Sequence, residues 1–455
     1  MNDHISEREP LITSIYISNL TILSHSDDTS VSIVEKNANL KSGSTIHFLE
    51  NVTADSREYR GIHPIIALES HQQNLSKVVA KAIAHLPVAR PDFVSATRGP
   101  GMRSNLSVGL DIAKGLSLAW QVPLVGVHHM QAHLLTPRLV SSLAEKKDGG
   151  SHDNSPDFPF LSILVSGGHS LLVHSSSITD HQVLASSEDI AIGESLDKAA
   201  REILPTSVLE SAKSTMYGKA LEQFAFPNGR ADYADYKPPM TRGEELIKHN
   251  SPWGWSITAP FSNTRQLEFS FSSIAATVSR IISRKKAKLG DDNTDHIMEI
   301  DERVALARES MRISFEHLAS RTVIALEALN PKGPLPRGSS PQRRINTLVV
   351  SGGVAANQFL MTILRSFLDV RGFGHVDIIA PPAVLCTDNA AMIGWAGIEM
   401  FEAGWRTDLG VLPLRKWSLD AREGDGGILG PDGWLHWLDC ITLYIIYAAD
   451  IYVNN

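Results

Sequence analysis

The sequence predicts an α/β protein with two related lobes and a cleft between them, and three observations support this prediction. Two β-hairpin signals, at residues 21–34 and 161–174, lie about 140 residues apart, and each is followed by helical segments. A third signal, Ser351-Gly352-Gly353, joins an apolar strand to an amphipathic helix. Because each lobe must bury its sheet under helices, a tandem of lobes leaves a cleft into which the turns can point.

The first lobe begins with the hairpin signal TILSHSDDTSVSIV, which combines a short apolar strand, a polar turn and an alternating second strand. Two helices are expected further along, over 106–120 and over 127–139, the second of them after the strand-like VPLVGV. The change from alternating to helical periodicity is typical of an α/β unit.

The second lobe repeats this pattern in LSILVSGGHSLLVH, with the turn at residues 166–169. Amphipathic helices are expected over 303–329 and over 389–401. Two polar stretches, 141–157 and 331–344, are expected to be loops or insertions.

The third glycine signal, TLVVSGGVAANQFL, combines a strand, a glycine turn and the start of a helix. The first N–H groups of a helix have no partner within it, so this arrangement suits an anion. Gly-Gly turns are common, and each alone is more often structural than a ligand site. Because two Ser-Gly-Gly turns follow apolar strands in one chain, a phosphate site and a purely structural turn are equally good interpretations.

The composition excludes several classes of protein. Of the 455 residues 43% are hydrophobic and 20% are charged, which excludes wholesale disorder. The formal net charge of -8 argues against a broadly basic surface but leaves room for a local groove. The densest basic run, 284–288, is either a solvated helix end or a contact for nucleic acid.

Two cysteines, Cys386 and Cys440, exclude a disulfide scaffold and a cysteine-built zinc site, and they suit a reducing compartment. No apolar run reaches the roughly 18 residues that a membrane helix needs, so no membrane partner is expected. The first residues are acidic rather than Arg-rich, so neither a secretory signal nor a transit peptide is evident.

His129 and His133 lie four residues apart on a predicted helix, which places both imidazoles on one face. Such a pair can share a metal, although an isolated pair is more often incidental. His128 is expected to point elsewhere. A zincin peptidase needs Glu directly after the first histidine, and Met130 stands there, which disfavours that class.

Asp388, in the segment LCTDNAAMIG, lies just before a predicted helix. It is either the N-cap of that helix or the carboxylate of a two-histidine, one-carboxylate site. Such a site with open positions suits iron(II) or zinc in a catalytic role. Cys386 is expected to be a small buried residue rather than a ligand.

Five segments occur in the order in which the TsaD family has them, and the resemblance runs from about residue 21 to about residue 420. They read TRGPGMRSN through VHHMQAH, LVSGGHS, GESLDKAAREI, VVSGGVAANQFL and LCTDNAAMIGWAG. The chain therefore resembles the TsaD family of tRNA threonylcarbamoyladenosine synthases, formerly described as O-sialoglycoprotein endopeptidases. The ordered set is specific, although each fragment alone is not.

The resemblance implies an actin-like ASKHA fold of two RNase H-like lobes with a central cleft. It also implies transfer of threonylcarbamoyl from threonylcarbamoyl-adenylate to the N6 amine of adenosine-37 in tRNAs reading ANN codons, with release of AMP. One divalent metal per subunit, iron or zinc, and a separate synthase that supplies the adenylate are implied as well.

The resemblance carries over a set of site residues, and none of them is a protein nucleophile. Its metal ligands fall on His129, His133 and Asp388. Its nucleotide- and substrate-binding residues fall on Val165, Ser166, Gly167, Gly168, His169, Asp197, Gly218 and Asn357. For Asp197, a salt bridge with Lys198 or Arg201 is the structural alternative.

This chain departs from the family at its first hairpin and at its end. The family's first strand usually reads GIETSCDDT, whereas this chain has Leu23 in place of the Glu and Ser26 in place of the Cys. We expect a first lobe over 20–160, a second lobe over 161–420 and an atypical tail over 421–455.

The segment YGKALEQF and the 141–157 insertion resemble the mitochondrial eukaryotic branch, whose members are homodimers, which predicts a mitochondrial homodimer. Two other classes remain alternatives at this stage. An ASKHA nucleotide hydrolase or kinase shares the glycine turns but does not need the histidine pair. A metallopeptidase would use the pair but lacks the adjacent Glu.

Overall fold

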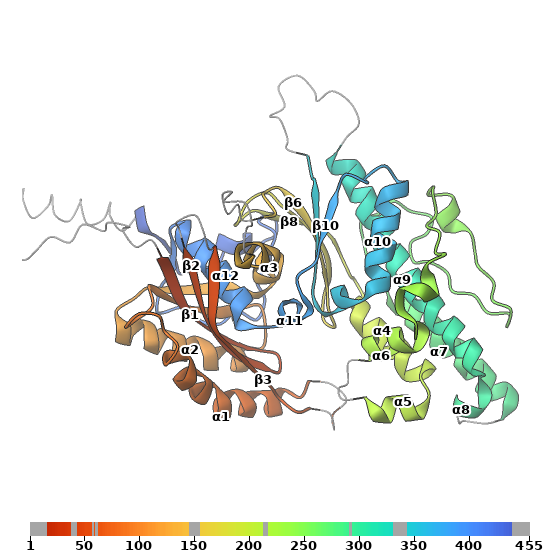
Figure 1. Cartoon of the computed structure of the whole chain (residues 1–455), viewed down its shortest axis with the longest axis horizontal. Coiled ribbons are helices and arrows are strands. Elements are labelled where there is room, and N and C mark those ends of the chain that lie inside the picture. Colours follow the sequence, from red (N-terminus) through yellow and green to blue (C-terminus); the bar gives the residue numbers. More distant parts are fainter. Residues whose placement is uncertain are drawn as a thin grey trace, which may run out of the picture.

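The computed structural model describes residues 16–37, 43–56, 59, 62–144, 155–212, 217–290, 294–330 and 344–438, and it contains two β-sheets (Figure 1). The first sheet has the order β12-β11-β5-β4-β1-β2-β3. Its strands are β1 (Tyr16–His25), β2 (Asp28–Asn37), β3 (Ser44–Thr53), β4 (Phe93–Gly99), β5 (Leu124–His128), β11 (Trp405–Thr407) and β12 (Trp434–His436).

The second sheet has the order β10-β9-β6-β7-β8. Its strands are β6 (Phe160–Val165), β7 (Ser170–Ser175), β8 (His181–Ser186), β9 (Thr347–Ser351) and β10 (Asp377–Ile379). In each sheet an antiparallel three-strand meander is extended by strands parallel to its first strand. The prediction of an α/β fold with two related lobes is confirmed by this shared pattern.

Helices cover both sheets (Figure 1). Those that pack on the first sheet are α1 (Pro64–Ile83), α2 (Arg103–Trp120), α3 (His129–Leu143) and α12 (Ala390–Glu402). Those of the second lobe are α4 (Ile192–Ile203), α5 (Thr206–Ser211), α6 (Gly218–Ala225), α7 (Ser272–Leu289), α8 (Thr294–Ile297), α9 (Ile300–Leu329), α10 (Gln358–Val370) and α11 (Ala383–Cys386). Short 3-10 turns are η2 (Gly229–Tyr233), η3 (Glu244–Leu246), η4 (Gly353–Ala356) and η5 (Gly427–Leu429).

One hydrophobic cluster joins the two lobes. It contains Leu23 and Val125 from the first sheet, Leu164 and Val349 from the second, and Leu134 from α3, all of them fully or almost fully buried. Helix α3 contacts β6 and β9 of the second sheet as well as strands of the first. Helix α3 therefore connects the two sheets.

Several predicted boundaries need correction. The helix expected from residue 127 begins at His129, since Val127 and His128 continue strand β5. A 3-10 turn, η4, separates the third glycine turn from α10. Strands β11 and β12 lie on either side of residue 420, and both join the first sheet. The division at residues 160 and 420 therefore stays a prediction about domains, while the sheet itself is built from both ends of the chain.

Some expectations fall on parts of the chain outside the described residues. They include residues 1–15, Cys440, the tail beyond 438, and most of the two predicted insertions, at 145–154 and 331–343. None of the helices in the described part of the chain is both long and apolar enough to cross a membrane.

A buried ion pair joins α3 to α12. The Arg138 guanidinium Nε donates to both carboxylate oxygens of Glu399, at 2.8 and 3.1 Å, and Nη1 donates to the Pro156 carbonyl at 2.6 Å. The two side chains are 10% and 5% exposed. A buried charge without its partner is strongly destabilising, so the pair stabilises the position of α3 relative to α12.

We expect Arg138→Met to lower the free energy of unfolding by about 3–5 kcal/mol, because it leaves the Glu399 charge buried without its partner. Urea denaturation would measure the loss. Lys81→Met is the matched control, because it removes the cation of an ion pair with Glu50 whose side chains are 58% and 31% exposed. That control should cost less than about 1 kcal/mol. Equal losses in the two variants would contradict the structural role of the buried pair.

Candidate metal and nucleotide site

Three parallel strands of the first sheet end side by side, and polar side chains follow two of them. In the order β5-β4-β1, the strands β1 and β5 both run parallel to β4. His25 is the last residue of β1, and His129 is the first residue of α3, directly after β5. Their rings stack with centroids 3.7 Å apart and planes 15° apart. Strand order therefore brings together two histidines that are distant in the sequence.

His133 lies one helical turn after His129 on α3, as the spacing predicted. The two rings meet edge to face with centroids 4.9 Å apart. His128 points away, because its Nδ1 accepts from the N–H groups of Met130 and Gln131 and caps α3. The i, i+4 pair is thus presented on one face, and the preceding histidine serves the helix.

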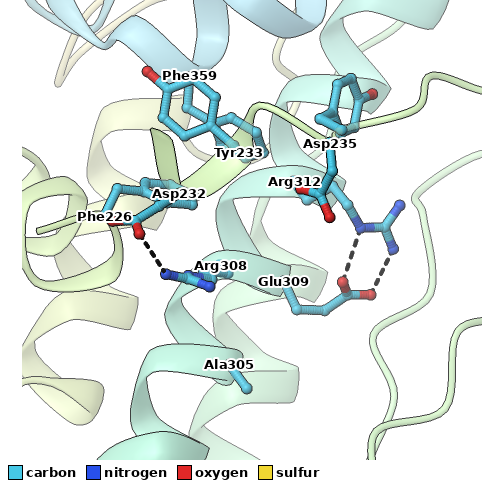
Figure 2. Close-up of a pocket in the computed structure, with 10 residues that line it drawn as sticks. Phe226, Asp232, Tyr233, Asp235, Ala305, Arg308, Glu309, Arg312 and Phe359 are labelled. Atoms are coloured by element: carbon cyan, nitrogen blue, oxygen red, sulfur yellow. Dashed lines mark hydrogen bonds and ion pairs between the residues drawn. The ribbon is translucent and has the colours of Figure 1, made fainter. Parts of the chain in front are cut away.

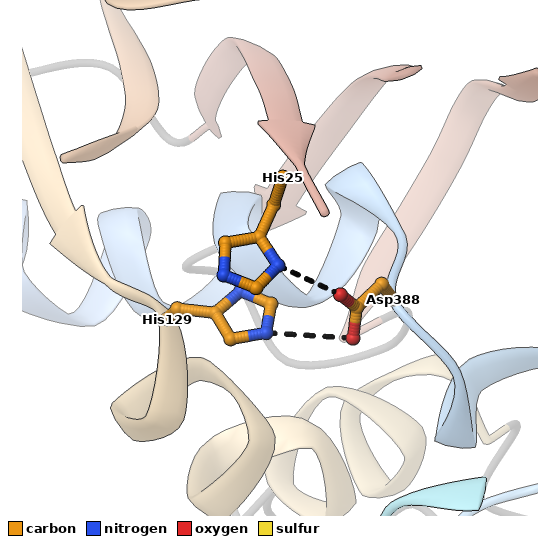
Figure 3. Close-up of side chains that lie close together, drawn as sticks. All are labelled: His25, His129 and Asp388. Atoms are coloured by element: carbon orange, nitrogen blue, oxygen red, sulfur yellow. Dashed lines mark hydrogen bonds and ion pairs between the residues drawn. The ribbon is translucent and has the colours of Figure 1, made fainter. Parts of the chain in front are cut away.

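Asp388 does not cap the following helix, because the side chain of Asn389 accepts from the Met392 N–H and does so instead. The Asp388 carboxylate is left to the histidines. One oxygen lies 3.4 Å from Nε2 of His129 and 3.1 Å from Nε2 of His133, and the other lies 3.0 Å from Nδ1 of His25. Figure 3 shows His25 and His129 directed at this carboxylate.

The electrostatics of the cluster favour an ionised carboxylate. Burial alone would raise the pKa of Asp388, but its interactions with His129, His133 and His25 hold it well below its usual range. Burial, followed by the nearby His25, lowers the pKa of His129 to about 3. Neutral imidazole beside carboxylate is the donor set that zinc and iron(II) prefer.

The site also fits a divalent metal in size. Potential ligand atoms of His25, His129 and Asp388 all lie within 4.8 Å of one another. The sequence-based set was His129, His133 and Asp388, and the structure brings both of these histidines to the Asp388 carboxylate. His25 was missed because a histidine at a hairpin turn has no partner at helical spacing. The only available signal was its position before Asp27 and Asp28 in the altered first hairpin.

The hairpin turn that carries His25 is held by two other side chains. Ser26 has a positive φ of 52°, which is uncommon for a residue with a Cβ. Its carbonyl accepts from Nδ2 of Asn105 at 2.8 Å and lies 3.3 Å from Nε2 of His71. The Nδ1 of His71 is 2.7 Å from the Thr29 hydroxyl. These contacts stabilise a strained turn beside the histidine cluster.

The turn of the second hairpin, residues 165–169, is closed by its own hydrogen bonds. The Ser166 N–H donates to the His169 carbonyl at 2.9 Å. The Ser166 hydroxyl accepts from the N–H groups of Gly168 and His169, at 3.3 and 3.0 Å. In this conformation the N–H groups of Ser166, Gly168 and His169 therefore have partners within the turn itself.

Two glycines allow other segments to pack on this turn. A Cβ on Gly352, whose φ is 95°, would lie 2.3 Å from the Val165 carbonyl oxygen. A Cβ on Gly193, at the start of α4, would lie 2.6 Å from the Ser166 carbonyl oxygen. Both sites exclude any larger residue, so the third glycine turn and the N-terminus of α4 meet beside the Ser166 turn.

The glycine turns are adjacent to the histidine cluster. The Ser351 hydroxyl donates to the His133 carbonyl at 3.1 Å. His169 is exposed, yet partial burial and then the charges of His25 and His133 lower its pKa. A ligand bound at these turns would thus lie next to Asp388.

Asp197 and Gly218, both predicted from the resemblance, contact each other. The Gly218 N–H donates to the Asp197 carboxylate at 2.9 Å. Lys198 pairs with Glu194 at 2.8 Å, so the proposed Lys198 salt bridge with Asp197 is wrong. Burial raises the pKa of Asp197, although the N–H groups of Gly218 and Tyr217 and then the charge of Arg201 oppose the rise.

Asn357 has a structural contact of its own, because its side chain accepts from the Leu360 N–H and caps α10. It lies at the end of η4, directly after the third glycine turn.

Two cavities in the second lobe lie apart from this cluster, since neither is lined by any of its residues. Figure 2 shows the smaller one, of about 190 Å³. Both of its arginines already have partners: Arg312 pairs with Glu309 at 2.7 Å, and Arg308 lies over the ring of Phe226. The histidine cluster, with its potential metal-binding side chains, therefore remains the candidate functional site.

Comparison with known proteins agrees with the sequence resemblance. A family model described as TsaD, tRNA N6-adenosine threonylcarbamoyltransferase, matches residues 47–395. A mitochondrial tRNA N6-adenosine threonylcarbamoyltransferase from Schizosaccharomyces pombe is 34% identical over 432 residues, which cover 91% of this chain and 88% of that protein. One from Danio rerio, also named mitochondrial, is 31% identical over 346 residues, covering 76% and 74%. One from Brucella anthropi is 30% identical over 399 residues, covering 87% and 94%.

The half-buried Asp28 makes the stability of the metal-free protein depend on pH. Burial raises its pKa from 3.8 to about 6, against the hydrogen bond from Thr53. A carboxyl whose pKa is raised by folding stabilises the folded state below about pH 4, and this contribution is lost as the pH rises through 6. We expect Asp28→Asn to remove this part of the decline, as measured by urea denaturation between pH 4 and 7.

Thr53→Ala provides the opposite change. It removes a donor that lies 2.5 Å from the Asp28 carboxylate, so the pKa of Asp28 should rise further and the decline should extend to higher pH. Identical pH profiles for the wild type and Asp28→Asn would show that this carboxyl does not titrate as described.

Proposed function

The chain belongs to the TsaD family of tRNA N6-adenosine threonylcarbamoyltransferases, and we propose how its own residues carry out threonylcarbamoyl transfer to tRNA. The family's fold class, the actin-like ASKHA fold, agrees with the two related sheets. The single observation that carries the proposal is the Asp388 carboxylate, which contacts both histidines of the motif beside the glycine turns.

His129, His133 and Asp388 would hold one divalent metal, iron or zinc. The neutral His129 imidazole and the ionised carboxylate support this assignment. A bound metal with open positions supplies Lewis acidity toward an oxygen of the substrate. The remaining steps depend on side chains and backbone groups of the two lobes.

The turn Val165, Ser166, Gly167, Gly168 and His169 would bind the phosphate of threonylcarbamoyl-adenylate. Because Ser166 already accepts from two of the turn's N–H groups, the turn must open slightly or use the Gly167 N–H. Glycine without a side chain permits a close approach of the phosphate at this point.

Asp197 and Gly218 would bind the adenosine portion, since a carboxylate accepts from two ribose hydroxyls. Asn357 would contribute mainly by fixing the start of α10 beside the third glycine turn. With the donor held at both ends, its carbonyl is positioned for attack, and positioning alone lowers the barrier substantially.

The reaction balances without a protein nucleophile. The N6 amine of adenosine-37 in a tRNA reading ANN codons attacks the carbamoyl carbon and loses one proton. A C–N bond forms, the bond from carbon to the phosphate oxygen breaks, and AMP leaves. The product is threonylcarbamoyladenosine in the tRNA.

The family model and the three relatives share one transferase description, which favours transfer over nucleotide hydrolysis, phosphorylation or peptide cleavage. We further propose a mitochondrial site of action, which is supported by the names of two relatives. A separate synthase that supplies the adenylate and a homodimeric state complete the proposal. Part of the basic run 284–288 remains available for tRNA, although Lys285 pairs with Glu302 at 2.6 Å.

Asp388→Ala should abolish transfer, because it removes the carboxylate that all three histidines contact. We expect a loss of at least about a hundredfold, the scale of a lost Lewis acid. The measurement is AMP release that depends on both tRNA and threonylcarbamoyl-adenylate, together with nucleoside analysis of the anticodon loop. AMP release without tRNA, at the same rate, would indicate a hydrolase and contradict the proposal.

Asp197→Asn should weaken binding of the adenylate rather than the chemical step. The amide oxygen can still accept from the Gly218 N–H, so the local fold is preserved, while the charge that meets the ribose is lost. We expect KM for threonylcarbamoyl-adenylate to rise by about tenfold with little change in kcat. Lys198→Ala, next to it on α4, is the matched control and should leave both constants unchanged.

A further inference from the structure

His25 has a contact on each ring nitrogen, and the two contacts differ in kind. Its Nε2 lies 3.2 Å from the carbonyl oxygen of Pro100, which follows β4. Its Nδ1 lies 3.0 Å from the Asp388 carboxylate. A carbonyl oxygen can only accept, so the hydrogen of a neutral His25 belongs on Nε2. The lone pair of Nδ1 then faces the carboxylate.

A lone pair and a carboxylate repel each other unless a positive charge lies between them. A proton on Nδ1 can supply that charge, and so can a metal ion. A hydrogen bond from the second nitrogen to a backbone carbonyl is the arrangement that fixes the tautomer of metal-ligating histidines. His25 therefore has the contacts of a ligand already in place.

The other two histidines lack this support. The Nδ1 atoms of His129 and His133 are buried and have no hydrogen-bond partner in the part of the chain that the structure describes. His25 is the one member of the cluster whose second nitrogen is held, and its ring is further fixed by stacking on His129.

We propose that Nδ1 of His25 is a further ligand of the metal, so that three imidazoles and one carboxylate surround it. This goes beyond the ligands carried over from the family, because GIETSCDDT has serine at the position of His25. The inference rests on the metal site of the proposed function but not on its reaction. On metal binding, any proton on Nδ1 is released to solvent.

A fourth protein ligand determines which metals still have a coordination position free for substrate. Four protein ligands complete the tetrahedral shell that zinc prefers in structural sites. A metal that accepts five or six ligands keeps room for substrate. His25 thus favours an ion of higher coordination number in the working enzyme.

The experiment uses the full chain, stripped of metal and loaded with one equivalent of Zn²⁺ as the probe. X-ray absorption at the zinc edge counts imidazole ligands, and competition with a chelator gives the affinity. We expect three imidazoles in the wild type. His25→Ser should show two, with an affinity lower by at least about tenfold. If His25→Ser does not fold, the wild-type count alone decides.

Two control variants separate ligation from other effects. His85→Ser removes an exposed histidine that lies just after α1 and outside the cluster, and it should leave both readouts unchanged. Ser26→Gly removes a hydroxyl that lies 3.0 Å from the same Nδ1, in a left-handed conformation that glycine favours, and should keep three imidazoles.

Two imidazoles in the wild type, or an unchanged affinity in His25→Ser, would overturn the proposal and leave His25 as an ion-pair partner of Asp388. A chain that binds zinc through three imidazoles but does not modify tRNA would instead contradict the proposed function alone.

Discussion

The charge of one carboxylate, Asp388, organises the site. An ionised carboxylate largely removed from water must be compensated, and here three imidazoles from two different strand ends supply the compensation. This requirement explains the local architecture. Asn389 takes over the cap of α12, His128 takes over the cap of α3, and the strained turn at Ser26 is held by donors from α1 and α2. Because these neighbouring residues make the structural contacts, the side chains of Asp388, His129 and His25 remain directed at one another.

The two lobes meet through contacts that tolerate little displacement. The shared hydrophobic core and the Arg138–Glu399 pair fix α3 against α12. Gly352 and Gly193 allow backbone segments to approach the turn at Val165 and Ser166 more closely than any side chain would permit. The histidine cluster of the first lobe therefore lies directly against the glycine turns of the second. This placement suits the proposed transfer, because the carbonyl under attack and the leaving phosphate belong to one small molecule.

The sequence predicted the fold class, the two hairpins and the long helices, because each has a local signature: alternation, helical periodicity or a glycine turn. It also predicted the i, i+4 pair on α3, because that spacing is fixed by helix geometry. It did not predict His25, which reaches the site through strand order rather than spacing. It also could not predict that β11 and β12 return to the first sheet, since a strand of three residues has almost no sequence pattern. The residues of the turn at Ser166 match those of the family's nucleotide-binding turn. Its internal hydrogen bonds, however, depend on a backbone conformation that the composition does not specify.

Two of the departures from the family in the first hairpin, at Leu23 and His25, are consistent with one physical account. Both residues lie on the same face of β1, which packs against α12. Leu23 is fully buried in a cluster with Met130, so a glutamate at that position would place a second carboxylate in an apolar core. With leucine there, the core stays apolar and the site has one fewer negative charge. His25, two residues further along the same face, supplies a ligand that needs no additional charge. The hairpin thus replaces an anionic contribution to the site with a neutral one, and Asp388 remains the carboxylate on which the histidines converge.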